Sequence, residues 1–352
     1  MSYAMSIVKH FGGLPFLAAI WQSAITQGAA FWNLFLRLLG RQSMLSLETK
    51  VNKEAESVAP PHHITYKPIP GSWQRREHPN WPESVFRIPE TVPHGTIYYI
   101  TKGKQVGGGA TSHVELLPSG DIVKSPKSNP YSPKEEEDHR RDMRIEAEAY
   151  RRLGNCPYTP RLVDWDPESC CLTLEYLEKG DLATYMTKTA QIPGEIRQRW
   201  ALQAAAALAA LHAVDIVHCD VTPRNFMLSA ALDLHIADFA GSSIAGSAPT
   251  TAAGPRFLPP GWSWHRAVEK TDDIFALGSV IYFVIVGEEP YAGLEEEEVE
   301  KLFGKAIFPD VSGLVCGAVI RGCWDGAFKT SEQVINSLNN VYDTNPRAAQ
   351  VG

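Results

Sequence analysis

The stretch IVHCDVTPRNFML, residues 216–228, places a histidine, an aspartate and an asparagine between apolar residues. It follows the pattern H-x-D-x-x-x-x-N, with Asp220 and Asn225 as its last two polar positions. A second stretch, HIADFAGSS at residues 235–243, follows it and contains Asp238. Carboxylate and amide oxygens are hard ligands of the kind that magnesium prefers, so Asn225 and Asp238 are candidate metal ligands. Asp220 is a candidate acceptor for a substrate proton.

In this order, the two motifs resemble the catalytic loop and the D-F-G region of the eukaryotic protein kinase superfamily. The resemblance extends over about residues 98–342. It implies an α+β, bilobal fold with a small β-rich N-lobe and a larger helical C-lobe. It also implies an enzyme that uses ATP and Mg2+ to transfer the γ-phosphoryl group to a protein Ser, Thr or Tyr hydroxyl. In this resemblance Asp220 is catalytic, and Asn225 and Asp238 bind the metal.

The order of apolar patterns supports the same fold class. Strand-like runs come first, in IYYIT, HVELL, DIVKS and LTLEYL, and helical runs dominate afterwards. The alanine-rich run over residues 195–213 has strong helix propensity and predicts a largely buried helix. Strands followed by helices indicate an α+β arrangement with two unequal halves.

A glycine-rich segment, VGGGATSHV at residues 106–114, precedes these motifs. Gly107, Gly109 and Ser112 occupy the positions of a G-x-G-x-x-G loop. A dinucleotide fingerprint needs a helix next, but HVELL is strand-like, and the lysine and Ser/Thr of a P-loop are missing. Two interpretations stay open: a strand-turn-strand cover over nucleotide phosphates, or a plain hairpin turn.

The strand DIVKS holds Lys124 at the position that resembles the lysine of the kinase V-A-I-K strand. In RIEAEAYRRLG, Glu146 has the spacing of the glutamate that pairs with this lysine, and Glu148 is the competing candidate. The resemblance implies that the Lys124–Glu146 pair holds the α and β phosphates.

Two further segments resemble kinase elements. LTLEYLEKGDL resembles the connection between the lobes, where backbone groups from Glu175 to Leu177 would bind the adenine edge. EKTDDIFALGSVIYFVIVGEEPY resembles the long central helix of the large lobe. In it, Asp273 would brace the catalytic loop through backbone hydrogen bonds.

Accessory positions depart from the family. Cys219 replaces the arginine that binds a phosphorylated activation loop in many kinases, and a thiol cannot make that bidentate contact. Thr222 and Arg224 leave the type of acceptor hydroxyl open. Ala240 replaces the glycine of D-F-G. Residues 259–261 lack the glutamate of A-P-E, and the arginine that would pair with it, expected after Trp324, is also missing. Three hypotheses therefore remain: an active protein kinase, a nucleotide-binding pseudokinase or scaffold, and a small-molecule kinase.

Bulk composition narrows the class of partner and the compartment. The net charge of -7 gives no indication of nucleic-acid binding, so we expect no nucleic-acid partner. The resemblance to protein kinases implies a protein substrate instead. The six cysteines show neither zinc-site nor disulfide-framework spacing, which favours a reducing, intracellular setting that is cytoplasmic by default. No motif addresses the oligomeric state.

Composition divides the chain into four parts. Residues 1–44 are hydrophobic and free of acidic residues, which fits a membrane-associated or mitochondrial targeting segment or a plain extension. Residues 45–95 are predicted as a Pro-rich linker, 96–342 as the kinase-like domain, and 343–352 as a C-terminal tail.

Overall fold

The N-lobe contains a sheet of five antiparallel strands: β3 (Lys104–Gly108), β4 (Ser112–Leu116), β5 (Ile122–Pro126), β6 (Leu162–Asp166) and β7 (Cys171–Leu174). Their spatial order is β3-β4-β5-β7-β6. Successive side chains in a strand point to opposite faces, so Val114 and its cross-strand partner Lys124 share one face. His113 and Glu115 lie on the other face.

The computed structural model describes residues 63–344, which fall within one compact unit, Pro61–Gly352. The predicted targeting segment 1–44 lies outside the described residues, as does most of the predicted tail. Among residues 63–344, no helix is both long enough and apolar enough to cross a membrane.

Helix α6 (Pro133–Leu153) packs against the sheet and positions one predicted site residue. Its first turn is fixed locally, because the Ser132 side chain accepts a hydrogen bond from the Glu135 N–H and Pro133 takes the first helical position. Side chains three and four apart share a helix face, and the buried face includes Met143, Glu146, Ala147 and Tyr150.

Residues 63–95 differ from the predicted linker. They form β1 (Thr65–Ile69), α5 (Ser72–Glu77) and the 3-10 helix η2 (Glu83–Phe86). Strand β1 pairs in parallel with β2 (Thr96–Ile100), the predicted IYYIT strand, in a separate two-stranded sheet. The reason is tertiary: the ring of Tyr66 packs edge-on against His113 of β4, with 5.3 Å between centroids, and Ile69 is buried. A strand that is stabilised by residues far away in the sequence can form without a regular alternation of apolar and polar residues.

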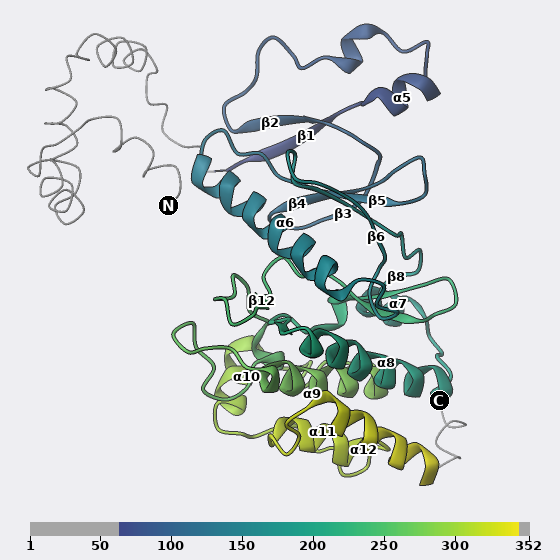
Figure 1. Ribbon diagram of the computed structural model, residues 1–352, viewed down its shortest axis with the longest axis vertical. Coiled ribbons are helices and arrows are strands. Elements are labelled where there is room, and N and C mark those ends of the chain that lie inside the picture. The colour runs from purple at the N-terminus through teal and green to yellow at the C-terminus, as the bar shows by residue number, and fades with distance from the viewer. Residues whose placement is uncertain (1–62, 345–352) are drawn as a thin grey trace, which may run out of the picture. The chain divides into compact units, whose positions relative to one another are not determined.

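The C-lobe is mainly helical. Its helices are α7 (Leu182–Lys188), α8 (Gly194–Ala213), α9 (Lys270–Val286), α10 (Glu296–Phe303), α11 (Gly317–Trp324) and α12 (Ser331–Thr344). Short strands and 3-10 turns join them: β8 (Gly180–Asp181), β9 (Ile216–Val217), η3 (Pro223–Asn225), β10 (Phe226–Leu228), β11 (Leu234–Ile236), β12 (Ser243–Ile244) and η4 (Pro255–Phe257). Figure 1 shows the strands β1–β6 with α6 in one lobe and α8–α12 in the other. The predicted α+β, bilobal fold is therefore confirmed.

The C-lobe core surrounds α8 and α9. The predicted alanine-rich helix is observed as α8, and its alanines at 201, 204, 205 and 207 are buried. Helix α9 approaches α11 closely at Gly278, where a Cβ atom would lie only 2.7 Å from the Cβ of Cys323. This close packing holds α9 under the catalytic loop.

Candidate active site

A cavity of about 620 Å³ lies between the lobes. Small-molecule sites commonly enclose about 300 to 1,000 Å³, so its size suits a nucleotide. The β3–β4 hairpin, β5 and α6 line it from the N-lobe, and the segments around η3 and after β11 line it from the C-lobe. All the predicted site residues line it: Gly107, Gly109, Ser112, Lys124, Glu146, Glu175, Leu177, Asp220, Asn225 and Asp238.

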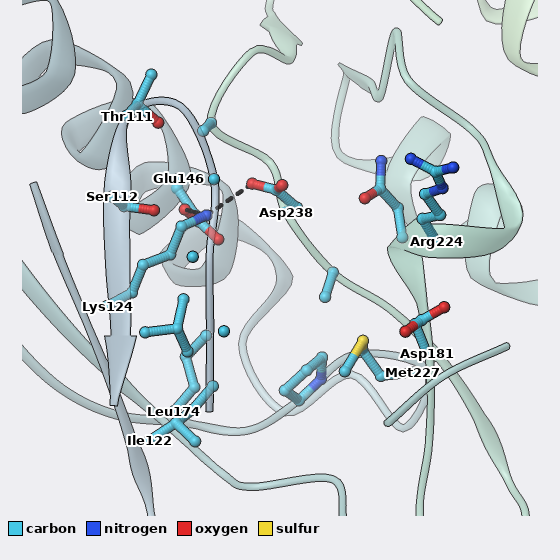
Figure 2. Close-up of a pocket in the computed structure, with 18 of the residues that line it drawn as sticks. Thr111, Ser112, Ile122, Lys124, Glu146, Leu174, Asp181, Arg224, Met227 and Asp238 are labelled. Carbon is cyan, nitrogen blue, oxygen red and sulfur yellow. Dashed lines mark hydrogen bonds and ion pairs between the residues drawn. The ribbon is translucent and has the colours of Figure 1, made fainter. Parts of the chain in front are cut away.

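Lys124 joins two carboxylates that come from separate elements. Its Nζ lies 2.6 Å from Oε2 of Glu146 in α6 and 2.6 Å from Oδ1 of Asp238 in the loop after β11. Figure 2 shows the Lys124 side chain reaching across the cavity toward both groups. The Glu146 side chain is 1% exposed, whereas that of Asp238 is 53% exposed. Asp238 can therefore contact a ligand while it holds Lys124.

Lys124 and Asp238 each favour the charged form of the other, whereas burial raises the pKa of Glu146. Burial lowers the pKa of Lys124, but the carboxylates of Asp238 and Glu146 outweigh burial and raise that pKa above its ordinary value. The Lys124 ammonium in turn holds the pKa of Asp238 below its ordinary value. At neutral pH the cavity therefore contains a fixed cation next to an ionised, ligand-facing carboxylate.

The structure also separates the two candidate glutamates. Glu148 is on the outer face of α6, where it accepts hydrogen bonds from Arg151 at 2.8 Å and Arg152 at 2.8 Å. Glu146, two residues earlier, points inward to Lys124. The preference for Glu146 agrees with this geometry.

The catalytic-loop motif brings Asp220 and Asn225 into direct contact. The Nδ2 of Asn225 donates to the Asp220 carbonyl oxygen at 2.7 Å and to Asp220 Oδ2 at 2.8 Å. The amide nitrogen is thereby occupied, which leaves the Asn225 amide oxygen to face the cavity. The same contacts fix the orientation of the Asp220 carboxylate.

Asp273 braces this loop from below. Its Oδ2 accepts from the His218 backbone N–H at 2.7 Å and lies 3.0 Å from Nε2 of His212, and its Oδ1 accepts from the Cys219 N–H at 3.0 Å. These bonds hold Cys219 at a φ of 69°, a left-handed conformation that costs a non-glycine residue free energy. Asp238 is also left-handed, at a φ of 67°. Strained backbone therefore occurs on both segments that carry the candidate site.

We expect the substitution Asp273→Asn to lower the free energy of unfolding by about 2 kcal/mol, because an amide nitrogen would face a buried backbone donor. Thermal unfolding of the full chain, followed by circular dichroism, measures this. Asp325→Asn is the control, since its side chain is 52% exposed and lies 3.8 Å from Arg321. Such surface pairs contribute about 0 to 1 kcal/mol. Equal melting temperatures for the two variants would contradict the bracing role.

The segment between the lobes offers an unpaired backbone edge. The Glu175 N–H donates to the Arg161 carbonyl oxygen at 3.0 Å, and the Leu177 carbonyl oxygen accepts from Gly180 at 3.1 Å. Within the described chain, neither the Glu175 carbonyl oxygen nor the Leu177 N–H has a protein partner. One acceptor and one donor therefore line the cavity two residues apart, which is the pattern that an adenine edge requires.

The glycine-rich segment forms a hairpin at the opposite wall. The Gly109 N–H donates to the Ser112 carbonyl oxygen at 3.1 Å and closes the turn between β3 and β4. Lys127 Nζ lies 2.6 Å from the Gly109 carbonyl oxygen, a contact that the sequence did not suggest. The structure thus shows a hairpin that lines the cavity, with a lysine beside it.

The donor set fits a magnesium ion held together with a nucleotide. No group of three or more His, Cys, Asp or Glu side chains gathers to hold a metal among residues 63–344. The Asn225 amide oxygen and the Asp238 carboxylate are instead two oxygen donors among the residues that line the cavity, and they could serve as ligands. Magnesium keeps waters and is usually bound by one or two protein oxygens plus phosphates, so two ligands suffice.

Tyr150 is a cavity residue that the sequence analysis missed. It lies one helical turn after Glu146, packs edge-on against Phe239 with 5.0 Å between ring centroids, and is 2% exposed. The ring of Phe239 also packs against that of His218 in the catalytic loop, with 5.4 Å between ring centroids. The signal was available, because residues four apart share a helix face. These rings connect α6 to the catalytic loop.

A different anchor accompanies the missing A-P-E glutamate. The guanidinium of Arg256 in η4 is largely buried and donates to the carbonyl oxygens of Pro290, Tyr291 and Leu294. The Arg256 carbonyl oxygen accepts from Ser279 Oγ at 2.7 Å, and Ser279 Oγ accepts from Trp324 at 3.0 Å. Arg256 Nε also lies 3.8 Å from Oε2 of Glu289. The end of the activation segment is thus tied to the loop after α9 through Arg256, and to α9 and α11 through Ser279 and Trp324.

A bilobal fold with a nucleotide-sized cavity and a lysine between two carboxylates defines a phosphotransferase-like class of protein. Residues 100–334 match the family described as the protein kinase domain. This chain belongs to the protein kinase family.

Curated relatives agree with this assignment. One is the serine/threonine-protein kinase ATG1c of Arabidopsis thaliana, 30% identical over 41% of this chain and 20% of its own length. Another is a putative mitogen-activated protein kinase kinase kinase 7-like protein of Drosophila melanogaster, 33% identical over 39% of this chain and 36% of its own length. A third is the serine/threonine-protein kinase ULK3 of Xenopus laevis, which is 31% identical over 39% of this chain and 30% of its own length. The match thus spans about a third or less of each relative.

Proposed function

We propose that this chain is a protein kinase that uses Mg-ATP to transfer the γ-phosphoryl group to a serine or threonine hydroxyl of a protein substrate. The observation that carries this proposal is the contact of Lys124 with both Glu146 and Asp238, on the wall of the cavity that Asp220 also lines. The relatives ATG1c and ULK3, which are named serine/threonine-protein kinases, support the acceptor type. Transfer to a tyrosine hydroxyl is measured in the same test.

Each side chain has a role that follows from its position. The Lys124 ammonium would pair with the α and β phosphates, and Glu146 would hold that ammonium in place. Asp238 and Asn225 would hold magnesium, which when bound neutralises charge on the phosphate oxygens. The Asp220 carboxylate, oriented by Asn225, would accept the proton of the acceptor hydroxyl.

The acceptor would approach from a second cavity of about 280 Å³, which shares Asp220 and Asn225 with the nucleotide cavity. Its wall includes Thr222 and Arg224, the two positions at which the sequence left the acceptor open. A hydroxyl-bearing side chain that enters here meets the carboxylate of Asp220 directly.

The test is transfer of radiolabelled γ-phosphate by the purified full chain to a protein mixture and to Ser, Thr and Tyr peptides. Thermal shift with Mg-ATP is measured in parallel. Stabilisation by Mg-ATP together with labelled phosphoserine or phosphothreonine is the expected result. Binding without transfer to any acceptor would indicate a scaffold, and transfer only to small alcohols would indicate a small-molecule kinase. If the chain shows neither Mg-ATP binding nor phosphoryl transfer, the proposal is contradicted altogether.

A further inference from the structure

The face of the N-lobe sheet opposite the nucleotide cavity carries a second, smaller cavity. It has a volume of about 220 Å³, and strands β1 and β2 form part of its wall together with β4, β5 and β7. The side chains that line it include His113, Glu115, Ser125 and Cys171, together with Lys102. Such a set of polar groups is unusual on a covered sheet face, and none of them is needed for phosphoryl transfer.

Cys171 lies next to a cation in this cavity. Its Sγ is 2.6 Å from Nζ of Lys102, 3.4 Å from Oγ of Ser125 and 3.7 Å from the Ser169 carbonyl oxygen. Lys102 Nζ also donates to Ser125 Oγ at 3.2 Å. The hydrogen bond to Ser125 thus helps to hold the Lys102 ammonium beside the Cys171 sulfur.

These neighbours stabilise the thiolate. Burial raises the pKa of Cys171, but the hydrogen bond that its sulfur accepts from Lys102 and the one that it makes with Ser125 Oγ outweigh burial and bring that pKa below its ordinary value. His113 adds no positive charge at neutral pH, because burial and the nearby Lys127 lower its pKa to about 4. Lys102 is thus the cation that acts on the sulfur.

A buried carboxyl group in the same cavity, Glu115, whose pKa is raised by burial, points independently to a small polar ligand. Glu115 is 2% exposed, and its Oε2 accepts from the Lys102 backbone N–H at 3.2 Å. Its Oε1 is buried and has no hydrogen-bond partner within the part of the chain that the structure describes. Leaving a buried acceptor unpaired costs about 1 to 3 kcal/mol, so this oxygen is an acceptor for a donor that enters the cavity.

We propose that Cys171 is a peroxide-reactive thiolate, and that this cavity is an oxidation site on the sheet face opposite the nucleotide cavity. The Cys171 sulfur attacks one oxygen of hydrogen peroxide; an S–O bond forms and the O–O bond breaks. The leaving hydroxide takes a proton from solvent and becomes water. The sulfur is oxidised by two electrons to sulfenic acid, and the peroxide is reduced. Glu115 Oε1 would accept a hydrogen bond from the entering peroxide.

The test uses the purified full chain, treated with hydrogen peroxide in the presence of dimedone, which traps sulfenic acids. Tandem mass spectrometry follows labelling at each cysteine over time. Cys171 is buried, so any advantage must come from its thiolate character rather than from access. On that basis we expect Cys171 to be labelled about tenfold faster than Cys156, a partly exposed cysteine. Cys171→Ser assigns the label, because Cys170 is adjacent in the same peptide.

Lysine variants test whether the Lys102 cation, rather than solvent exposure of the sulfur, sets the labelling rate of Cys171. Lys102→Met should slow labelling of Cys171 about tenfold and leave Cys156 unchanged, because it removes the cation that stabilises the thiolate. Lys104→Met, at an exposed residue of β3, is the matched control and should change neither rate. Circular dichroism verifies that both variants fold. Equal labelling of Cys171 and Cys156 in the wild type, or an unchanged Cys171 rate in Lys102→Met, would overturn the proposal. Neither result depends on kinase activity.

Discussion

Asp220→Asn is expected to lower kcat for phosphoryl transfer by about a thousandfold, because a positioned proton acceptor contributes roughly 10² to 10⁴ in rate. Asparagine has the shape of aspartate, and its amide oxygen can still accept from Asn225 Nδ2, as Asp220 Oδ2 does at 2.8 Å. The orientation of Asn225, and thus Mg-ATP binding, should survive. Steady-state kinetics with γ-labelled ATP should therefore show a large loss of kcat and a KM for ATP within about twofold of wild type.

Asp164→Asn is the matched control, since it makes the same chemical change at an exposed position of β6 and should leave kcat unchanged. If Asp220→Asn retained more than about a tenth of wild-type kcat, the proton of the acceptor hydroxyl would have to leave by another route. A selective loss of ATP affinity would instead place Asp220 in nucleotide binding rather than in transfer.

Some parts of the site that the sequence predicted depend on short-range spacing, whereas Lys124 and Asp238, 114 positions apart, were predicted from the resemblance to protein kinases. Asp220 and Asn225 are joined by one loop, and Glu146 is separated from Glu148 by the geometry of one helix. Helix geometry predicts that Glu146 and Glu148 lie on different faces, and the choice of Glu146 came from the resemblance of its spacing to that of the kinase glutamate. The strand-then-helix order likewise predicted two unequal lobes.

The features that escaped prediction depend on contacts between distant residues. Lys102 and Cys171 are 69 positions apart, and neither belongs to a motif. The Arg256 anchor uses mainly backbone carbonyl oxygens, which every residue has, and its one carboxylate neighbour, Glu289, is 33 positions away. Strand β1 contains Pro68 and pairs with β2 across an insertion of short helices. In each case the tertiary fold supplies the partner that local sequence cannot indicate.

Lys124→Met is expected to abolish measurable transfer and also to destabilise the fold by about 3 kcal/mol, since removing one partner strands a buried charge. Glu146 is the stranded group, because its side chain is 1% exposed, whereas Asp238 is 53% exposed and remains hydrated. For a domain of this size the loss corresponds to a fall in melting temperature of roughly 6 to 12 °C. Differential scanning fluorimetry of the full chain measures it.

The double variant Lys124→Met, Glu146→Met distinguishes a stranded charge from a packing defect. Replacing both members of a buried pair by apolar groups is often close to neutral, so we expect most of the lost melting temperature to return while activity stays absent. Burial already raises the pKa of Glu146 in the wild type. In the single variant, loss of the Lys124 cation raises that folded-state pKa further above the unfolded value, so Glu146 takes up a proton as the pH falls. That uptake stabilises the variant at low pH and is lost as pH rises, so its deficit relative to wild type should be smaller at about pH 5 than at about pH 8. A deficit that is independent of pH and persists in the double variant would show that the lysine contributes through the packing of its alkyl chain rather than through its charge.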